Sequence, residues 1–284
     1  MAVEPRGLFA VPAPVRDLFK RFPLHVSPAD ALPVRSPDCH PASSPRLYVF
    51  ASEDDARHGR PSFNPSCLKW QTLLRIARVH VELVSSSNHA SPSGALPFLL
   101  PPPPSHLKPA VPLTGSKLHQ YAISHGASKL QEDEPARLEA YQALLVNKIR
   151  PAWLYTLYLL PANDPLLTRL YLPESPFLRL PLRQTLRTAA TDEILKTTRR
   201  PLLQPAQLYT DATTAFRSLS ALLGDNEWFF GAQEPDLFDA EVFAYTYLIL
   251  DETLGWADQS LAQCLSQFDN LVQHRLRLYQ RCWS

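Results

Sequence analysis

The chain has 284 residues, of which 45% are hydrophobic and 19% are charged. This balance supplies enough apolar surface for a sizeable core, excludes wholesale disorder and leaves room for two small domains. The 28 basic and 27 acidic side chains give a net charge of +1, so the overall charge does not indicate a nucleic-acid-binding protein.

Proline and cysteine usage narrows the class of protein further. The chain contains 29 prolines and only 8 glycines, which predicts stiff connections. Its cysteines lie far apart without a C-x-x-C pair (Cys39, Cys67, Cys264 and Cys282). Neither a zinc site nor a disulfide framework is therefore expected, and reduced thiols are favoured. No apolar run reaches the roughly 18 residues of a membrane span, and the first residues lack a signal-peptide pattern, so we expect a soluble or peripheral protein.

Residues 1–45 form a proline-rich arm that contains nine prolines. Such a segment cannot hold long regular structure, although VRDLFKRF permits one short amphipathic turn. Two interpretations are open. The arm is either disordered, or it is a docking segment that becomes ordered on a partner, with Phe19 and Phe22 as candidate contacts.

Residues 46–126 predict a small α/β domain. RLYVF (46–50) and HVELV (80–84) are short apolar strands, and PSCLKWQTLLRIARV (65–79) between them has apolar residues at helical spacing. Strand, helix and strand in this order form a βαβ unit with parallel strands and a right-handed crossover. Three further features complete the segment: a third apolar stretch, a proline run and a candidate helix (GALPFLL at 94–100, 101–104 and 113–126).

Residues 131–284 are expected to be all-helical. The stretch 131–160 opens with acids and a proline, as helices often do, and we expect a kink at Pro151. Prolines interrupt 161–207, and a further helix is expected at 208–224. The last helix is expected to run from 258 to 283 with one apolar face (Leu261, Leu265, Phe268, Val272 and Tyr279).

The stretch 161–207 is basic, with seven Lys or Arg and four Asp or Glu residues. Arg183 and Arg187 are four residues apart and share a helical face if Pro181 lies in the first turn of a helix. With Arg179 they offer a surface for anionic lipid headgroups or a partner. The ordinary alternative, a solvated exterior, is favoured because the excess charge is modest.

Asp236 and Asp239 stand three residues apart before an almost uninterrupted apolar run. An Asp at the cap position accepts a bond from a backbone N–H of the first turn, and an acid three residues later can bond the N–H of the cap residue. A catalytic or metal-binding carboxylate pair would need neighbouring His or Cys residues, which the local sequence lacks. We therefore interpret the pair as the start of a buried helix.

Two of these features, together with the domain order, resemble the glutathione-transferase fold, in which a thioredoxin-like domain precedes a helical domain. LPFL places Pro97 directly before an apolar strand, and DLFDA carries Asp236 and Asp239. The resemblance implies that the peptide bond before Pro97 is cis. It also implies that Asp236 and Asp239 are the cap of the fold's central buried helix.

Three stretches resemble the metaxins and the metaxin-like subunits of the mitochondrial sorting and assembly machinery: NPSCLKWQTLLRIARV, NEWFFGAQEPDLFDAEVFAYTYLIL and FDNLVQHRLRLYQRCW. The second stretch is the most specific of the three. The length of the chain and its lack of a membrane span are similar to those of the smaller, peripheral, fungal-type subunit.

The metaxin resemblance implies a non-enzymatic protein, without cofactor or metal, that is peripheral on the cytosolic face of the mitochondrial outer membrane. The implied partners are the membrane-embedded β-barrel insertase, a second metaxin-like subunit and β-barrel precursors bound through their C-terminal β-signal. Nucleic acid is not among them. The candidate partner surfaces are the arm with Phe19 and Phe22, the proline-rich loop, and the basic segment with Arg179, Arg183 and Arg187.

Two alternatives remain open. A cytosolic glutathione transferase needs a hydroxyl or thiol near the start of the first helix, where Ser62, Ser66 and Cys67 lie. It also needs an acid and a serine before the helix that follows the sheet, but Gly115 stands where the acid is expected and only Ser116 is retained. The other alternative is a transferase-like assembly domain of the translation apparatus, against which the metaxin-like C-terminal stretch argues.

Overall fold

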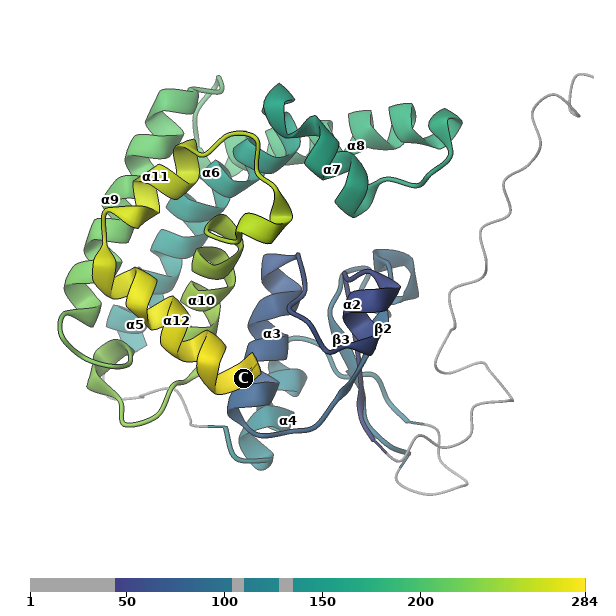
Figure 1. The fold of residues 1–284 in the computed structure, drawn as a ribbon, viewed down its shortest axis with the longest axis vertical. Coiled ribbons are helices and arrows are strands. Elements are labelled where there is room, and N and C mark those ends of the chain that lie inside the picture. The colour runs from purple at the N-terminus through teal and green to yellow at the C-terminus, as the bar shows by residue number, and fades with distance from the viewer. Residues whose placement is uncertain (1–43, 104–109, 128–134, 284) are drawn as a thin grey trace, which may run out of the picture.

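The computed structural model describes residues 44–103, 110–127 and 135–283. Phe19, Phe22 and most of the arm lie outside the described residues. Figure 1 shows a small sheet with its helices beside a larger part built of helices alone. This arrangement is the α/β domain followed by a helical domain that the sequence predicts.

The sheet has β1 (Arg46–Val49) at its centre, in the order β2-β1-β3. β2 (Glu82–Ser85) runs parallel to β1, with Leu83 opposite Leu47, and β3 (Phe98–Leu100) runs antiparallel, with Leu99 opposite Leu47. β2 begins two residues later than predicted. The apolar side chains Leu47, Leu83 and Leu99 are buried, so the sheet is held by its covered faces.

The crossover between β1 and β2 is α3 (Pro65–Ile76), and it confirms the predicted βαβ unit. α3 packs along α10 (Leu237–Ile249) of the helical domain. A short helix, α2 (Glu53–Arg57), lies between β1 and α3 and was not predicted. Its acidic turn has no apolar periodicity, and the Oγ of Ser52 caps it by accepting from the N–H of Asp55 at 3.1 Å.

After β2 the chain reaches β3 through a cis peptide bond between Leu96 and Pro97. Leu99 then exchanges backbone hydrogen bonds with Leu113 at 2.9 and 2.7 Å, which adds one bridge to the sheet. α4 (Ser116–Ser124) closes this part of the chain.

At Pro151, where a kink is predicted, the structure has a continuous helical path with wider turns. α5 (Pro135–Leu144) and α6 (Arg150–Leu154) are joined by a π-helical turn at Leu145–Ile149, and a second π-helical turn follows at Tyr155–Leu159. Pro151 has no N–H to donate, and wider turns on both sides allow the helix to continue past it.

The prediction that prolines break up 161–207 is confirmed at Pro173 and Pro201, which lie between helices, but a long helix still forms around Pro181. α7 (Asp164–Tyr171) is followed by α8 (Pro176–Thr198), a helix of 23 residues. α8 starts at Pro176, so Pro181 lies inside it and not in its first turn. Pro181 is exposed, so hydrogen bonds to water can offset the loss of the helix hydrogen bond that proline cannot donate.

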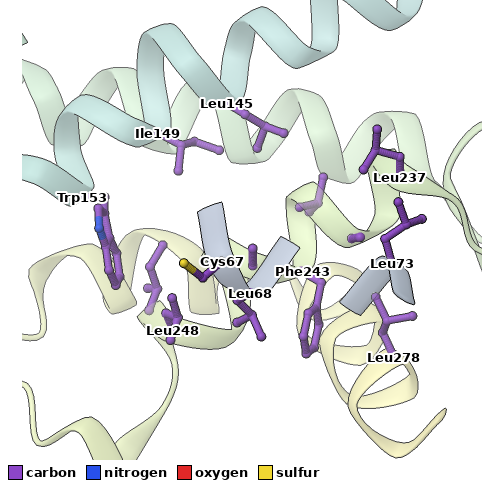
Figure 2. Packing of buried hydrophobic residues seen from close by; sticks show 14 of the residues in the cluster. Cys67, Leu68, Leu73, Leu145, Ile149, Trp153, Leu237, Phe243, Leu248 and Leu278 are labelled. Atoms are coloured by element: carbon purple, nitrogen blue, oxygen red, sulfur yellow. The ribbon is translucent and has the colours of Figure 1, made fainter. Parts of the chain in front are cut away.

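α9 (Pro205–Leu223) and α10 form the centre of the helical domain. Figure 2 shows Cys67, Leu68 and Leu73 of α3 among side chains of the helical domain, namely Leu145, Ile149, Trp153, Phe243, Leu248 and Leu278. The two domains therefore share one hydrophobic core.

The predicted last helix is in fact two helices. α11 (Ser260–Ser266) packs on α9, and α12 (Asp269–Trp283) packs on α10 and α3. The break at residues 267 and 268 shifts the buried face, so the buried side chains of α12 are Leu271, His274, Leu278 and Cys282. The predicted face was therefore wrong beyond Phe268, and Tyr279 is 36% exposed. In the described part of the chain no helix is both long and apolar enough to cross a membrane.

Candidate functional site

The start of α3 is where a transferase-like reactive group would lie. Asn64 caps this helix, because its Oδ1 accepts from the N–H of Cys67 at 3.2 Å. Free N–H groups at a helix start stabilise anions, including a thiolate. The cap therefore uses a donor that a bound thiolate would need.

Ser62 is fully buried beside this cap. Its hydroxyl donates to the carbonyl oxygen of Phe50 at 2.6 Å and accepts from the N–H of Asn64 at 3.2 Å. The N–H of Ser62 donates to Oε1 of Gln71 at 2.8 Å. These bonds fix the loop before α3, and they give Ser62 a structural role.

Cys67 is also fully buried, and its Sγ accepts from the N–H of Phe50 at 3.5 Å. Burial raises the pKa of the thiol to about 12, which outweighs the hydrogen bonds that favour the thiolate. The nucleophilic form of cysteine is the thiolate. Cys67 is therefore a neutral core residue at physiological pH.

Tyr171, the last residue of α7, covers the start of α3 from the helical domain. Its hydroxyl accepts from Nδ2 of Asn64 at 3.1 Å. Its ring packs edge-on against Phe50 and Phe63, with centroid distances of 5.4 and 5.2 Å. Burial raises the pKa of the Tyr171 hydroxyl, so it stays protonated. An aromatic side chain and a neutral hydroxyl thus cover the start of α3.

Of the three candidate reactive residues Ser62, Ser66 and Cys67, Ser66 is the exposed one. It borders a cavity of about 310 Å³ between the domains. An ion pair crosses this cavity: Nζ of Lys69 on α3 lies 2.8 Å from Oε1 of Glu241 on α10. Gln142 donates from Nε2 to the other oxygen of Glu241 at 3.1 Å. The charged groups that line this cavity bind each other across the domain interface. They therefore hold the two domains together.

Arg150 stands on another wall of the same cavity and is also paired. Its Nε lies 2.6 Å from Oε1 of Glu193 on α8. Burial alone would lower the pKa of Arg150, but the bond to Glu193 raises it above its ordinary value. Arg150 therefore remains charged and ties α6 to α8.

Gly115 and Ser116 occupy the place of the expected acid and serine. Gly115 has φ +52° and ψ −123°, a backbone conformation that residues other than glycine rarely adopt. A Cβ at Gly115 would meet no atom within 4 Å, so the backbone conformation and not crowding selects glycine. Ser116 is exposed at the start of α4 without an acidic neighbour in the first turn.

The chain before the cis bond at Pro97 is held by its own side chains. The N–H of Leu96 donates to Oδ1 of Asn88 at 2.9 Å. Ser91 donates from its hydroxyl to the carbonyl oxygen of Ala95 at 2.6 Å. The N–H of Leu96 is therefore already bonded and is not offered to a ligand.

Asp236 and Asp239 form a capping box at the start of α10. Oδ1 of Asp236 accepts from the N–H of Phe238 at 2.7 Å and of Asp239 at 3.3 Å, while Oδ2 of Asp239 accepts from the N–H of Asp236 at 3.1 Å. Burial, followed by repulsion from Asp239, raises the pKa of Asp236 to about 7.

A histidine that is distant in the sequence completes this cluster. Nε2 of His274 on α12 lies 2.8 Å from Oδ1 of Asp239, and both side chains are fully buried. Because a carboxylate can only accept, Nε2 carries the hydrogen. No substrate reaches this pair, so its role is structural. The missed signal is the position of His274 on the buried stripe with Leu271 and Leu278.

The structure brings Arg183 and Arg187 together on one acid. Nη1 of Arg183 lies 3.1 Å from Oδ2 of Asp164, and Nη2 of Arg187 lies 2.5 Å from Oδ1 of the same residue. Arg179 donates from Nε to the carbonyl oxygen of Pro173 at 2.8 Å. These arginines face α7 and its connection, so a partner contact through them stays a prediction. No group of three or more metal-ligating side chains occurs in the described ranges.

Two family models match the chain. The model for the glutathione S-transferase N-terminal domain matches residues 65–163, and the model for the glutathione S-transferase C-terminal domain matches residues 212–278. A solved glutathione S-transferase of Ceriporiopsis subvermispora in complex with glutathione superposes with a TM-score of 0.55 at 15% identity. The superposition covers 84% of this chain and 97% of that chain.

Two relatives share more of the sequence. Metaxin-3 of Xenopus laevis is 31% identical over 221 residues, which is 75% of this chain and 70% of that protein. Metaxin-3 of Danio rerio is 34% identical over 154 residues, which is 51% of this chain and 48% of that protein.

Proposed function

Because the chain belongs to the metaxin family and has the fold of the glutathione transferases, we propose that it is a non-enzymatic subunit of the mitochondrial sorting and assembly machinery. It would lie peripherally on the cytosolic face of the outer membrane. There it would bind the membrane-embedded β-barrel insertase, a second metaxin-like subunit and β-barrel precursors.

One observation carries the non-enzymatic part of this proposal: the bond between Asn64 and Tyr171 at the start of α3. Asn64 caps the helix with Oδ1 and holds the tyrosine hydroxyl with Nδ2. Among the residues that the structure describes, the thiol at this place is that of Cys67, which is buried and protonated. A group that activates glutathione must contact its sulfur, and Ser62, Asn64 and Tyr171 at this place already have internal partners.

The edge of the sheet supports precursor binding. Among the described strands, β2 has a partner on one side only. His80 and Glu82 are exposed there, beside a cavity of about 690 Å³ that Arg57 and His58 also line. An edge strand can pair with an extended peptide through backbone hydrogen bonds. We assign the β-signal of a precursor to this edge, with the cavity receiving its side chains.

The test is purification of the tagged protein from its own cells in mild detergent, followed by identification of the proteins that accompany it. Recovery with an outer-membrane β-barrel protein and a second metaxin-like chain is expected. Recovery alone, together with a glutathione titration that shows binding, would favour the transferase alternative, in which Ser66 and Ser116 contact glutathione. Recovery with aminoacyl-tRNA synthetases or elongation factors would favour the translation alternative.

A further inference from the structure

The first turns of α8 expose an unusual concentration of apolar side chains. Phe177 is 69% exposed, Leu180 68% and Leu182 43%, with Leu178 at 38% and an exposed Pro181 between them. We call residues 177–182 the α8 tip. Single exposed apolar residues are ordinary on a protein surface, but a contiguous group marks a binding surface.

The α8 tip lies at the outer edge of the molecule. In Figure 1 the connection from α7 turns at the edge of the helical domain, and α8 starts there and runs back across it. At 100° per residue, Phe177, Leu178, Leu180 and Leu182 cover more than half of the helix circumference. Arg179 and Arg183 point the other way, toward Pro173 and Asp164. The apolar surface is therefore convex, and the charged side of the helix faces the protein.

The charges around the α8 tip are mainly positive. From Asp164 to Arg187 the chain carries four arginines and two acids, hence a net charge of +2, and the first acid of α8 is Asp192. Arg183 and Arg187 share the single carboxylate of Asp164, so one positive charge of this group is not neutralised. A surface that complements this arrangement is apolar where it meets the tip and negatively charged around it.

We propose that the α8 tip is a membrane-contact element that inserts into the interface of a bilayer containing anionic lipid. A helix that lies in this interface buries its apolar side among the acyl chains and keeps its basic side at the headgroups. A protein partner would need a groove that encloses a convex helix end, whereas a lipid interface fits any convex shape. The membrane contact is independent of the proposed function in all but one respect. The identity of the membrane, the mitochondrial outer membrane, rests on that function.

Flotation of the full chain with phosphatidylcholine vesicles, with and without phosphatidylserine, tests this contact. Wild type is expected to float with the mixed vesicles, and omission of phosphatidylserine is expected to lower partitioning at least about fivefold. Leu180→Ser combined with Leu182→Ser is expected to lower partitioning about tenfold.

A matched control separates the α8 tip from general hydrophobicity. Leu202, in the connection after α8, is 71% exposed, which is close to the exposure of Leu180. Leu202→Ser is expected to partition as wild type does, whereas Leu180→Ser alone is expected to weaken binding. Both residues are exposed, so both single variants should retain the wild-type thermal melt.

Wild type that remains with the unbound fraction, or an α8-tip double variant that floats as wild type does, would overturn the proposal. If wild type fails to float but co-purifies with an outer-membrane β-barrel, the membrane contact is refuted. The function proposed above is then unaffected. If wild type floats through the α8 tip but co-purifies with no β-barrel, the membrane contact stands and that function fails.

Discussion

His274 on α12 and Asp239 on α10 meet at 2.8 Å in the interior of the helical domain, 35 residues apart in the chain. Asp239 also accepts from the N–H of Phe229 and of Asp236. One carboxylate therefore joins the last helix, the start of the central helix and the segment before it. This cluster secures the helical domain, and the central helix in turn packs along α3.

Asp239→Ala removes the acceptor of three buried donors. We expect a loss of about 3 kcal/mol in the free energy of unfolding, because each donor stays buried without a partner. Urea unfolding measures this loss. Asp225→Ala, at an exposed position, is the control and should change stability by less than about 0.5 kcal/mol. Equal stability of the two variants would disprove the role of Asp239.

Asp236→Asn should change how stability depends on pH. The pKa of Asp236 is about 7 in the folded protein, above the ordinary value of 3.8. Between these values the unfolded chain releases a proton that the folded protein keeps, so this group's contribution to stability falls as pH rises from 4 to 7. Asn keeps the Oδ1 acceptor of the cap without a charge.

The difference in unfolding free energy between Asp236→Asn and wild type should therefore grow in favour of the variant from pH 4 to pH 7, by up to a few kcal/mol. Urea unfolding of both proteins at a series of pH values measures this difference, in which titrating groups distant from Asp236 cancel. A difference that stays constant over this range would show that Asp236 is ionised throughout.

Cys67 should resist alkylation in the folded protein. The thiol is fully buried with a pKa of about 12, and burial likewise raises the pKa of Cys282 to about 11. Cys264 is only partly buried and should react first among the cysteines that the structure describes. Mass spectrometry after brief iodoacetamide treatment, with and without urea, locates the label. Rapid labelling of Cys67 without urea would indicate a reactive thiol.

Tyr171→Phe should cost about 1 kcal/mol of stability, because Nδ2 of Asn64 loses its acceptor. Thermal unfolding measures the effect, and Tyr279→Phe at a partly exposed position serves as the control. If the two substitutions have equal effects, the bond from Asn64 does not hold Tyr171 over the start of α3.

What could be predicted from the sequence is mainly local. The capping pair at Asp236 and Asp239 is a three-residue pattern, and it occurs as a capping box in the structure. The βαβ unit follows from short-range periodicity, as do most of the helices. The order of an α/β domain followed by a helical domain also follows from these patterns, and the resemblance to known proteins identified the fold.

The contacts that define the candidate site are long-range, and the sequence could not show them. Asn64 and Tyr171 are 107 residues apart. Arg187 and Asp164 are 23 residues apart and meet only because α7 and α8 fold back on each other. The stripe with His274 was missed because one helix was predicted where the chain bends at residues 267 and 268. An internal proline suggested a break in α8, but exposure makes Pro181 tolerable.

In the function proposed above, the edge of β2 binds the β-signal of a precursor and the chain does not bind glutathione. The most direct measurement is fluorescence anisotropy of a labelled peptide from the last strand of an outer-membrane β-barrel protein, titrated with the full chain, then with glutathione as competitor. We expect that the peptide binds and that glutathione neither binds nor displaces it. Binding of glutathione without binding of the peptide would show that the chain is a glutathione-binding protein and not the proposed adaptor.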